Sequence, residues 1–166
     1  MWRRECNTSK AVPSRPLLAT IGYESAAVPE FLATLRDAGI ELLVDVRAVA
    51  SSRRPGYAKT ALAANLASIG IDYLHLRGLG TPKEGRVAAR AGRHAEMHAI
   101  FRAHLATPDA QADLAALADI VDAGRRACLL CLEADPTHCH RSLVADALAR
   151  RMTLDIVHLH PEPDVD

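Results

Sequence analysis

Short apolar runs alternate with longer stretches of helical spacing along this chain, and this alternation limits the possible folds more than any other feature. The apolar runs are residues 17–21, 41–47, 71–76, 127–133 and 153–159. Helical spacing covers residues 28–35, 58–69, 87–105 (with a possible break at Gly92), 109–123 and 139–151. Strands that alternate with helices are typical of a parallel sheet covered on both faces. We therefore expect a single-domain three-layer α/β/α fold with a mainly parallel, roughly five-stranded sheet.

Length and charge limit the function classes. The chain has 166 residues, which suits one domain, and we expect that domain at residues 17–160, between a flexible leader (1–16) and a frayed C-terminus (161–166). Its 20 basic and 20 acidic residues give a formal net charge of zero, so general attraction to nucleic acid or membrane is not implied. A local basic patch could still bind nucleic acid. The sequence does not define the oligomeric state.

Cysteine usage and hydropathy indicate the compartment. The four cysteines form no evenly spaced disulfide framework, which is typical of reduced thiols. The basic N-terminus lacks the apolar run of a signal peptide, and no uncharged apolar stretch approaches the length of a membrane span. We therefore expect a cytoplasmic protein without a membrane partner.

Polar residues gather where the expected strands end. Parallel α/β sheets bind ligands beyond the carboxyl ends of their strands. The second run ends in Asp45 and Arg47, and the third ends in Tyr73 and His75. The fourth run ends in Cys131 and Glu133. We predict that Asp45, His75 and Cys131 lie at neighbouring strand ends and face one cleft. The alternative is that strand ends are polar only because they are near water. The Gly-rich segment 77–96 could form a mobile lid beside them.

The segment after the fourth run is the richest in reactive side chains. Asp135-Pro136 is typical of a helix start, which would place Cys139 in or beside the first turn. Free backbone N–H groups at such a position favour an anion and lower the pKa of a thiol. Cys139 could therefore be a nucleophile with His138 or His140 as proton carrier, or Arg141 could grip a phosphate or carboxylate. The structural alternative is a buried cysteine and an ion pair between Arg141 and Glu133.

Two further groups of residues offer other chemistry. Cys131, Cys139 and His140 could be soft metal ligands, but their spacing matches no standard zinc pattern, so we expect no metal and keep this set as the alternative. In the loop 51–59, Ser52, Arg53 and Arg54 could contact phosphates while Tyr57 stacks on a base or sugar. A solvated basic loop is the alternative.

Together these patterns define a candidate site and three candidate functions. The candidate catalytic residues are Asp45, His75, Glu133, Cys139 and His140. The candidate substrate-binding residues are Arg47, Ser52, Arg53, Arg54, Tyr57, Tyr73 and Arg141. The protein is then an enzyme or ligand-binding domain for a small phosphorylated or nucleotide-like anion, a non-catalytic nucleotide or nucleic-acid binding module, or a Cys/His metal protein. The sequence identifies no cofactor.

The order of several short motifs adds a family resemblance. The motifs are Thr20-Ile21-Gly22-Tyr23, Asp45-Val46-Arg47 followed by Ser52 and Pro55, Tyr73-Leu74-His75-Leu76 with Leu79-Gly80, and Cys131-x-Glu133 with Cys139-His140-Arg141. Over roughly residues 17–150 the chain resembles the domain-of-unknown-function 488 family. The resemblance implies a prokaryotic α/β domain and implies no reaction. The loop reads Leu79-Gly80-Thr81 where many relatives carry a second glycine.

Overall fold

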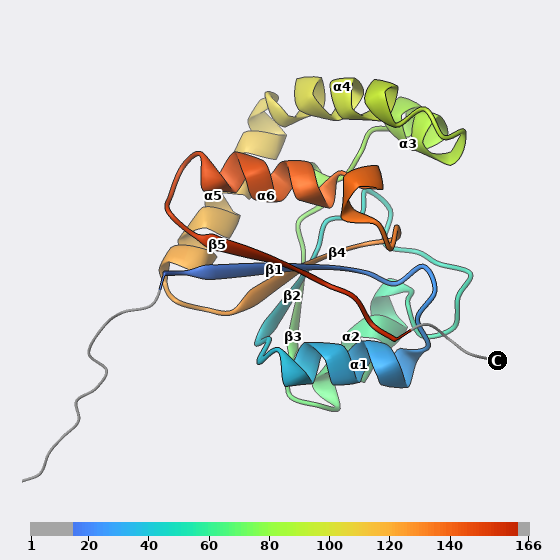
Figure 1. Cartoon of the computed structure of the whole chain (residues 1–166), viewed down its shortest axis with the longest axis vertical. Coiled ribbons are helices and arrows are strands. Elements are labelled where there is room, and N and C mark those ends of the chain that lie inside the picture. The colour runs from blue at the N-terminus through green and yellow to red at the C-terminus, as the bar shows by residue number, and fades with distance from the viewer. Residues whose placement is uncertain (1–14, 163–166) are drawn as a thin grey trace, which may run out of the picture.

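Every apolar run that the sequence marks as a strand lies in a single sheet (Figure 1). The structure is a computed structural model that describes residues 15–162. Within that range the strands are β1 (Leu17–Gly22), β2 (Leu42–Asp45), β3 (Asp72–His75), β4 (Ala127–Cys131) and β5 (Asp155–Leu159). Their order is β3-β2-β4-β1-β5, and all neighbours are parallel. The expected single-domain α/β fold is confirmed.

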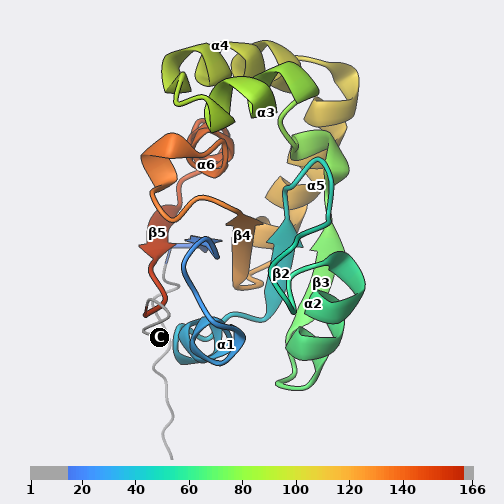
Figure 2. The same ribbon diagram turned by 90° about the vertical axis from the view of Figure 1, so that its right-hand side faces the viewer.

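Helices cover both faces of this sheet (Figure 2). On one face, α1 (Val28–Asp37) and α2 (Lys59–Ala67) pack against alternate strand residues such as Ile21, Leu43 and Leu130. On the other face, α5 (Pro108–Asp122) and α6 (Arg141–Ala149) cover the intervening residues, including Val44 and Leu129. The central strands are buried on both sides, which explains why they are continuous apolar runs in the sequence.

The segment between β3 and α5 has the helix break at Gly92 that the sequence suggested, and its first helix begins earlier than expected. It forms two helices, α3 (Lys83–Arg90) and α4 (His94–Leu105), joined at Gly92, whose φ is 78°. This left-handed conformation suits glycine and ends α3. Figures 1 and 2 show the pair stacked beyond α6 and α5, farther from the sheet. Much of the expected lid segment 77–96 is therefore helical.

The expected helix at 139–151 also begins later than predicted. A short 3-10 turn at Pro136–His138, capped by the Asp135 carboxylate, precedes Cys139, which is extended. Helix α6 then begins at Arg141. The expected leader falls mostly outside the described residues, as does most of the expected frayed C-terminus. Between residues 15 and 162, no helix is both long and apolar enough to cross a membrane.

Candidate functional site

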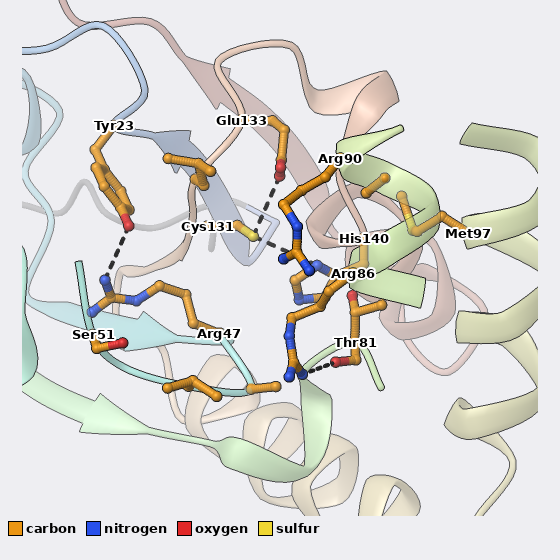
Figure 3. A pocket seen from close by; sticks show the side chains of 14 residues that line it. Tyr23, Arg47, Ser51, Thr81, Arg86, Arg90, Met97, Cys131, Glu133 and His140 are labelled. Atoms are coloured by element: carbon orange, nitrogen blue, oxygen red, sulfur yellow. Dashed lines mark hydrogen bonds between the residues drawn. The ribbon is translucent and has the colours of Figure 1, made fainter. Parts of the chain in front are cut away.

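A pocket of about 250 Å³ opens at the carboxyl edge of the sheet, under the α3–α4 pair (Figure 3). Its wall comes from the ends of β1, β2 and β4, from the helices α3 and α4, and from the residue that precedes α6. The polar and charged wall residues are Tyr23, Arg47, Ser51, Thr81, Arg86, Arg90, Cys131, Glu133 and His140. This is the edge at which parallel α/β sheets bind ligands.

Asp45 lies directly behind this wall and fixes Arg47. The Asp45 side chain is 0% exposed and accepts hydrogen bonds from Nε of Arg47 at 2.9 Å, Nη2 of Arg47 at 2.7 Å and the hydroxyl of Tyr73 at 2.5 Å. Burial alone would lower the pKa of Arg47, but the hydrogen bonds and charge of Asp45 outweigh it and raise the pKa. Nη1 of Arg47 donates to the Tyr23 hydroxyl at 3.2 Å, so a charged guanidinium is held at the pocket wall.

The three predicted strand-end residues do lie at one edge, on the adjacent strands β3, β2 and β4. Only Cys131 reaches the pocket wall. Asp45 is covered by Arg47, and Nε2 of His75 donates to the Arg47 carbonyl at 2.7 Å. Asp45, His75 and Tyr73 therefore brace the turn after β2, and the structure does not place them where a ligand would contact them.

The basic loop after β2 folds back onto the core. The Tyr57 ring is buried, stacks on Tyr23 with centroids 4.5 Å apart, and its hydroxyl donates to the Ala26 carbonyl at 2.8 Å. Nη2 of Arg54 donates to the same carbonyl at 2.7 Å. Burying the aromatic ring draws the loop inward, away from the orientation that the sequence suggested.

The other two predicted residues of this loop also lie apart from the pocket. The hydroxyl of Ser52 accepts from the Arg54 backbone N–H at 3.1 Å, and Arg53 is exposed. The loop contributes Ser51 to the pocket wall instead. The expected phosphate contacts from Ser52, Arg53, Arg54 and Tyr57 are therefore not brought together at the described pocket.

Arg141 differs most from its predicted role as an anion ligand. Its side chain is 0% exposed, and it fastens the chain after β4 to β1. Nε donates to the Thr20 hydroxyl at 3.1 Å, Nη1 to the Glu133 carbonyl, and Nη2 to the Ala134 carbonyl at 3.2 Å. The structural alternative, an ion pair with the Glu133 carboxylate, is replaced by this bond to the Glu133 backbone carbonyl. All three nitrogens are occupied, because α6 begins at Arg141 and directs the side chain beneath the loop.

A glycine makes this close approach possible. A Cβ at Gly22 would lie 1.8 Å from the Glu133 carbonyl oxygen and 3.0 Å from Nη1 of Arg141. Any side chain at position 22 would therefore push away the residue that carries the pocket carboxylate. This steric limit explains the glycine in the Ile21-Gly22-Tyr23 motif.

Two arginines that the sequence reasoning missed face the pocket from α3. Arg86 and Arg90 lie one helical turn apart, so their side chains share a face of the helix. Figure 3 shows both guanidiniums in the cavity near Cys131. Nη1 of Arg86 donates to the Thr81 carbonyl at 2.9 Å. Between residues 15 and 162, neither arginine forms an ion pair with a carboxylate.

Two thiols and an imidazole converge beside the pocket. Nδ1 of His140 lies 3.5 Å from Sγ of Cys131 and 3.8 Å from Sγ of Cys139. The other ring nitrogen, Nε2, donates to the Val46 carbonyl at 2.7 Å. That bond fixes the ring so that Nδ1 is directed at both sulfurs. All three side chains are buried, and Cys131 and His140 line the pocket whereas Cys139 does not.

Comparison with known proteins places the chain in a family. The family model described as "Domain of unknown function DUF488" matches residues 27–148. The chain belongs to the DUF488 family. No curated protein matches the chain, and no solved structure matches it. The DUF488 match runs from α1 to α6 and contains every residue of the pocket wall except Tyr23.

The electrostatics of this DUF488 site distinguish its thiols. The hydrogen bond to Cys139, together with burial, raises the pKa of Cys131 well above the usual thiol value. Burial alone would raise the pKa of Cys139 as well, but the Cys131 hydrogen bond and His140 outweigh it and lower the pKa. The thiol that ionises more readily is therefore Cys139, which does not line the pocket.

Glu133 is the carboxylate of the DUF488 pocket. Burial and the nearby Cys139 charge raise its pKa to about 7. Its Oε1 lies 3.7 Å from Sγ of Cys131, at the end of β4 (Figure 3). Near neutral pH this carboxylate is therefore only partly charged.

Proposed function

We propose that this DUF488 protein binds a small ligand carrying a phosphate, sulfate or carboxylate group in the pocket at the carboxyl edge of the sheet. One observation carries the proposal: Arg86 and Arg90 both line the pocket, and within residues 15–162 no carboxylate pairs with either. Adjacent guanidiniums repel each other, and an oxyanion between them removes the repulsion.

The energetics favour such a ligand. A hydrogen bond between a charged donor and an oxyanion contributes about 1.5–3 kcal/mol, and a guanidinium can make two of them in parallel. Arg47 lies at the same wall, but its nitrogens already donate to Asp45 and Tyr23, so Arg86 and Arg90 carry the binding. Among residues 15–162, the backbone carbonyl of Thr81 occupies one nitrogen of Arg86, which leaves the rest of the guanidinium for a ligand.

The size and shape of the pocket support a small molecule rather than a polymer. Its volume is about 250 Å³, slightly below the roughly 300–1,000 Å³ of pockets for drug-sized ligands. The arginines face into a cavity, and the formal net charge of the chain is zero. A nucleic-acid partner would be favoured by an extended basic surface instead. Cys131 and Glu133 would contact the same ligand, so the proposal allows chemistry on the bound molecule.

The proposal predicts selective stabilisation by oxyanions. Phosphate and sulfate should raise the melting temperature more than chloride at equal ionic strength, since a ligand that binds only the folded state stabilises it. Arg86→Ala and Arg90→Ala should each weaken this binding roughly tenfold or more, because a lost charge-assisted bond is worth at least one decade of affinity. Thermal shift across phosphate, sulfate, acetate and a mononucleotide would measure the effect and rank the ligand groups.

Two variants serve as controls. Arg102→Ala removes an exposed arginine of α4 that lies outside the pocket wall, so it should respond like the parent. Glu133→Gln removes negative charge from the wall and should not weaken anion binding. If no oxyanion stabilises the protein beyond chloride, or if the Arg86→Ala/Arg90→Ala double variant responds like the parent, the pocket is not an anion site.

A further inference from the structure

We infer that Cys131, Cys139 and His140 bind a thiophilic divalent cation of the zinc type beside the anion pocket. Sγ of Cys131, Sγ of Cys139 and Nδ1 of His140 all lie within 4.8 Å of one another. Cys131 ends β4, and Cys139 and His140 lie between the 3-10 turn at Pro136–His138 and the start of α6 at Arg141. The observation is independent of Arg86 and Arg90.

The two nitrogen-to-sulfur distances match a tetrahedral zinc ion, and the two sulfurs lie within 4.8 Å of each other. Zinc binds sulfur at about 2.3 Å and imidazole nitrogen at about 2.0–2.1 Å, so tetrahedral coordination places a sulfur and a nitrogen about 3.6 Å apart. The observed separations from Nδ1 of His140 are 3.5 Å to Cys131 and 3.8 Å to Cys139. An ion can therefore reach all three atoms with little movement of the backbone.

The surroundings of His140 are those of a metal-binding histidine. Such a histidine usually donates its second ring N–H to a carbonyl or carboxylate, which fixes the tautomer and the ring orientation. Nε2 of His140 donates to the Val46 carbonyl at 2.7 Å. Val46 is itself held, because its backbone N–H donates to the Leu130 carbonyl at 3.2 Å. The Nδ1 lone pair is thereby directed at the two sulfurs before any ion arrives.

The type of cation follows from the donors. Two sulfurs and one imidazole favour zinc or copper(I) over magnesium or calcium, which prefer oxygen ligands. Two thiolates also balance the charge of a divalent ion. A disulfide between Cys131 and Cys139 would bond the two sulfurs but would leave Nδ1 of His140 without a partner. A hydrogen-bonded pair of thiols without a metal ion is the competing explanation.

Two of the three inferred ligands border the pocket. Cys131 and His140 line it, so the inference includes a fourth coordination position open toward the pocket. Glu133 reaches Cys131 at 3.7 Å but does not belong to the converging set. Three protein ligands and one open position are typical of catalytic zinc sites. An anion held by Arg86 and Arg90 would then lie next to the metal.

Cobalt substitution tests the site directly. The full chain is purified under reducing conditions, stripped with a chelator and titrated with Co²⁺ and then Zn²⁺. We expect an equimolar uptake of Co²⁺, with the sulfur-to-cobalt charge-transfer band and the strong visible bands of a tetrahedral site, and displacement by Zn²⁺. Folded parent protein that takes up no Co²⁺, or that gives spectra without thiolate bands, would overturn the inference.

Matched cysteine variants locate the ligands. Cys131→Ser and Cys139→Ser should each weaken Co²⁺ binding by more than tenfold and diminish the charge-transfer band, with circular dichroism confirming that the variants fold. Cys128→Ala and Cys6→Ser should bind like the parent, because Cys128 lies outside the cluster and Cys6 lies outside the described residues. Unchanged binding in folded Cys131→Ser and Cys139→Ser would contradict the assignment. Sulfate binding by the metal-free protein is measured separately, so the anion site and the metal site can fail independently.

Discussion

Asp45→Asn is expected to destabilise the protein by about 3–5 kcal/mol, the usual result of removing one partner from a buried ion pair. Asp45 is 0% exposed and Arg47 is 6% exposed, and they are joined by two side-chain hydrogen bonds at 2.9 and 2.7 Å. The substitution would leave the Arg47 charge without its counterion in a pocket that already contains Arg86 and Arg90. Urea unfolding of the parent and the variant would measure the loss.

Two other substitutions identify the cause of the Asp45→Asn effect. Tyr73→Phe removes one hydrogen bond to the same carboxylate and leaves the ion pair intact, so its cost should be smaller, about 1.5–3 kcal/mol. Asp37→Asn changes an exposed carboxylate at the end of α1 and should leave the stability unchanged. Equal stability of Asp45→Asn and Asp37→Asn would show that the buried pair does not hold the turn after β2.

Arg141→Ala is expected to lose a similar amount, about 3–5 kcal/mol, because it creates a large cavity and leaves buried acceptors unpaired. Arg141 has one of the largest fully buried side chains in the described chain. Its guanidinium donates to Thr20 and to the carbonyls of Glu133 and Ala134. The chain after β4 should loosen with it. Urea unfolding, followed by sulfate titration of each folded variant, would test both stability and binding.

Arg141→Lys separates the structural role from an anion-binding role. A lysine keeps the positive charge and much of the buried volume, but its compact ammonium cannot span three separated acceptors. The loss of stability should therefore be smaller than in Arg141→Ala but still measurable. The sulfate response of this variant should persist, since Arg86 and Arg90 remain. An Arg141→Ala variant as stable as the parent, but without a sulfate response, would instead support the anion-binding role expected from the sequence.

The sheet and its functional edge can be predicted from the sequence because both depend on patterns along the backbone. A strand covered on both faces must be continuously apolar, as β1 and β4 are, and helices must separate parallel neighbours. Carboxyl ends of parallel strands necessarily meet at one edge. Asp45, His75 and Cys131 therefore fall together even though only Cys131 lines the pocket.

The direction of each side chain cannot be predicted in the same way. Arg141 looks like an anion ligand in the sequence, but α6 begins there and directs it beneath the loop. Tyr57 looks like a stacking platform for a ligand, but its ring is buried against Tyr23. Arg86 and Arg90 could not be predicted as pocket residues because the sequence does not show that α3 begins at Lys83. Once the helix is known, their one-turn spacing is clear.

The thiol cluster shows what spacing along the sequence does not reveal. Standard zinc patterns assume that neighbouring ligands come from one tight turn, so the spacing of Cys131 and Cys139 predicts no metal. In the structure, the chain leaves β4, makes the 3-10 turn at Pro136–His138 and returns through an extended Cys139. This return brings His140 and both sulfurs together, which the number of intervening residues alone does not reveal.

The most direct measurement for the anion pocket is an NMR titration of ¹⁵N-labelled protein with sodium sulfate at constant ionic strength. We predict saturable shifts of the Arg86 and Arg90 side-chain Nε–H signals and of backbone amides at residues 47–51 and 131–133. Arg102 should not shift, and the Arg86→Ala/Arg90→Ala variant should lose the backbone response. Shifts that grow linearly with sulfate, or that map to Arg125 and Arg126 at the opposite edge of the sheet, would contradict the proposed site.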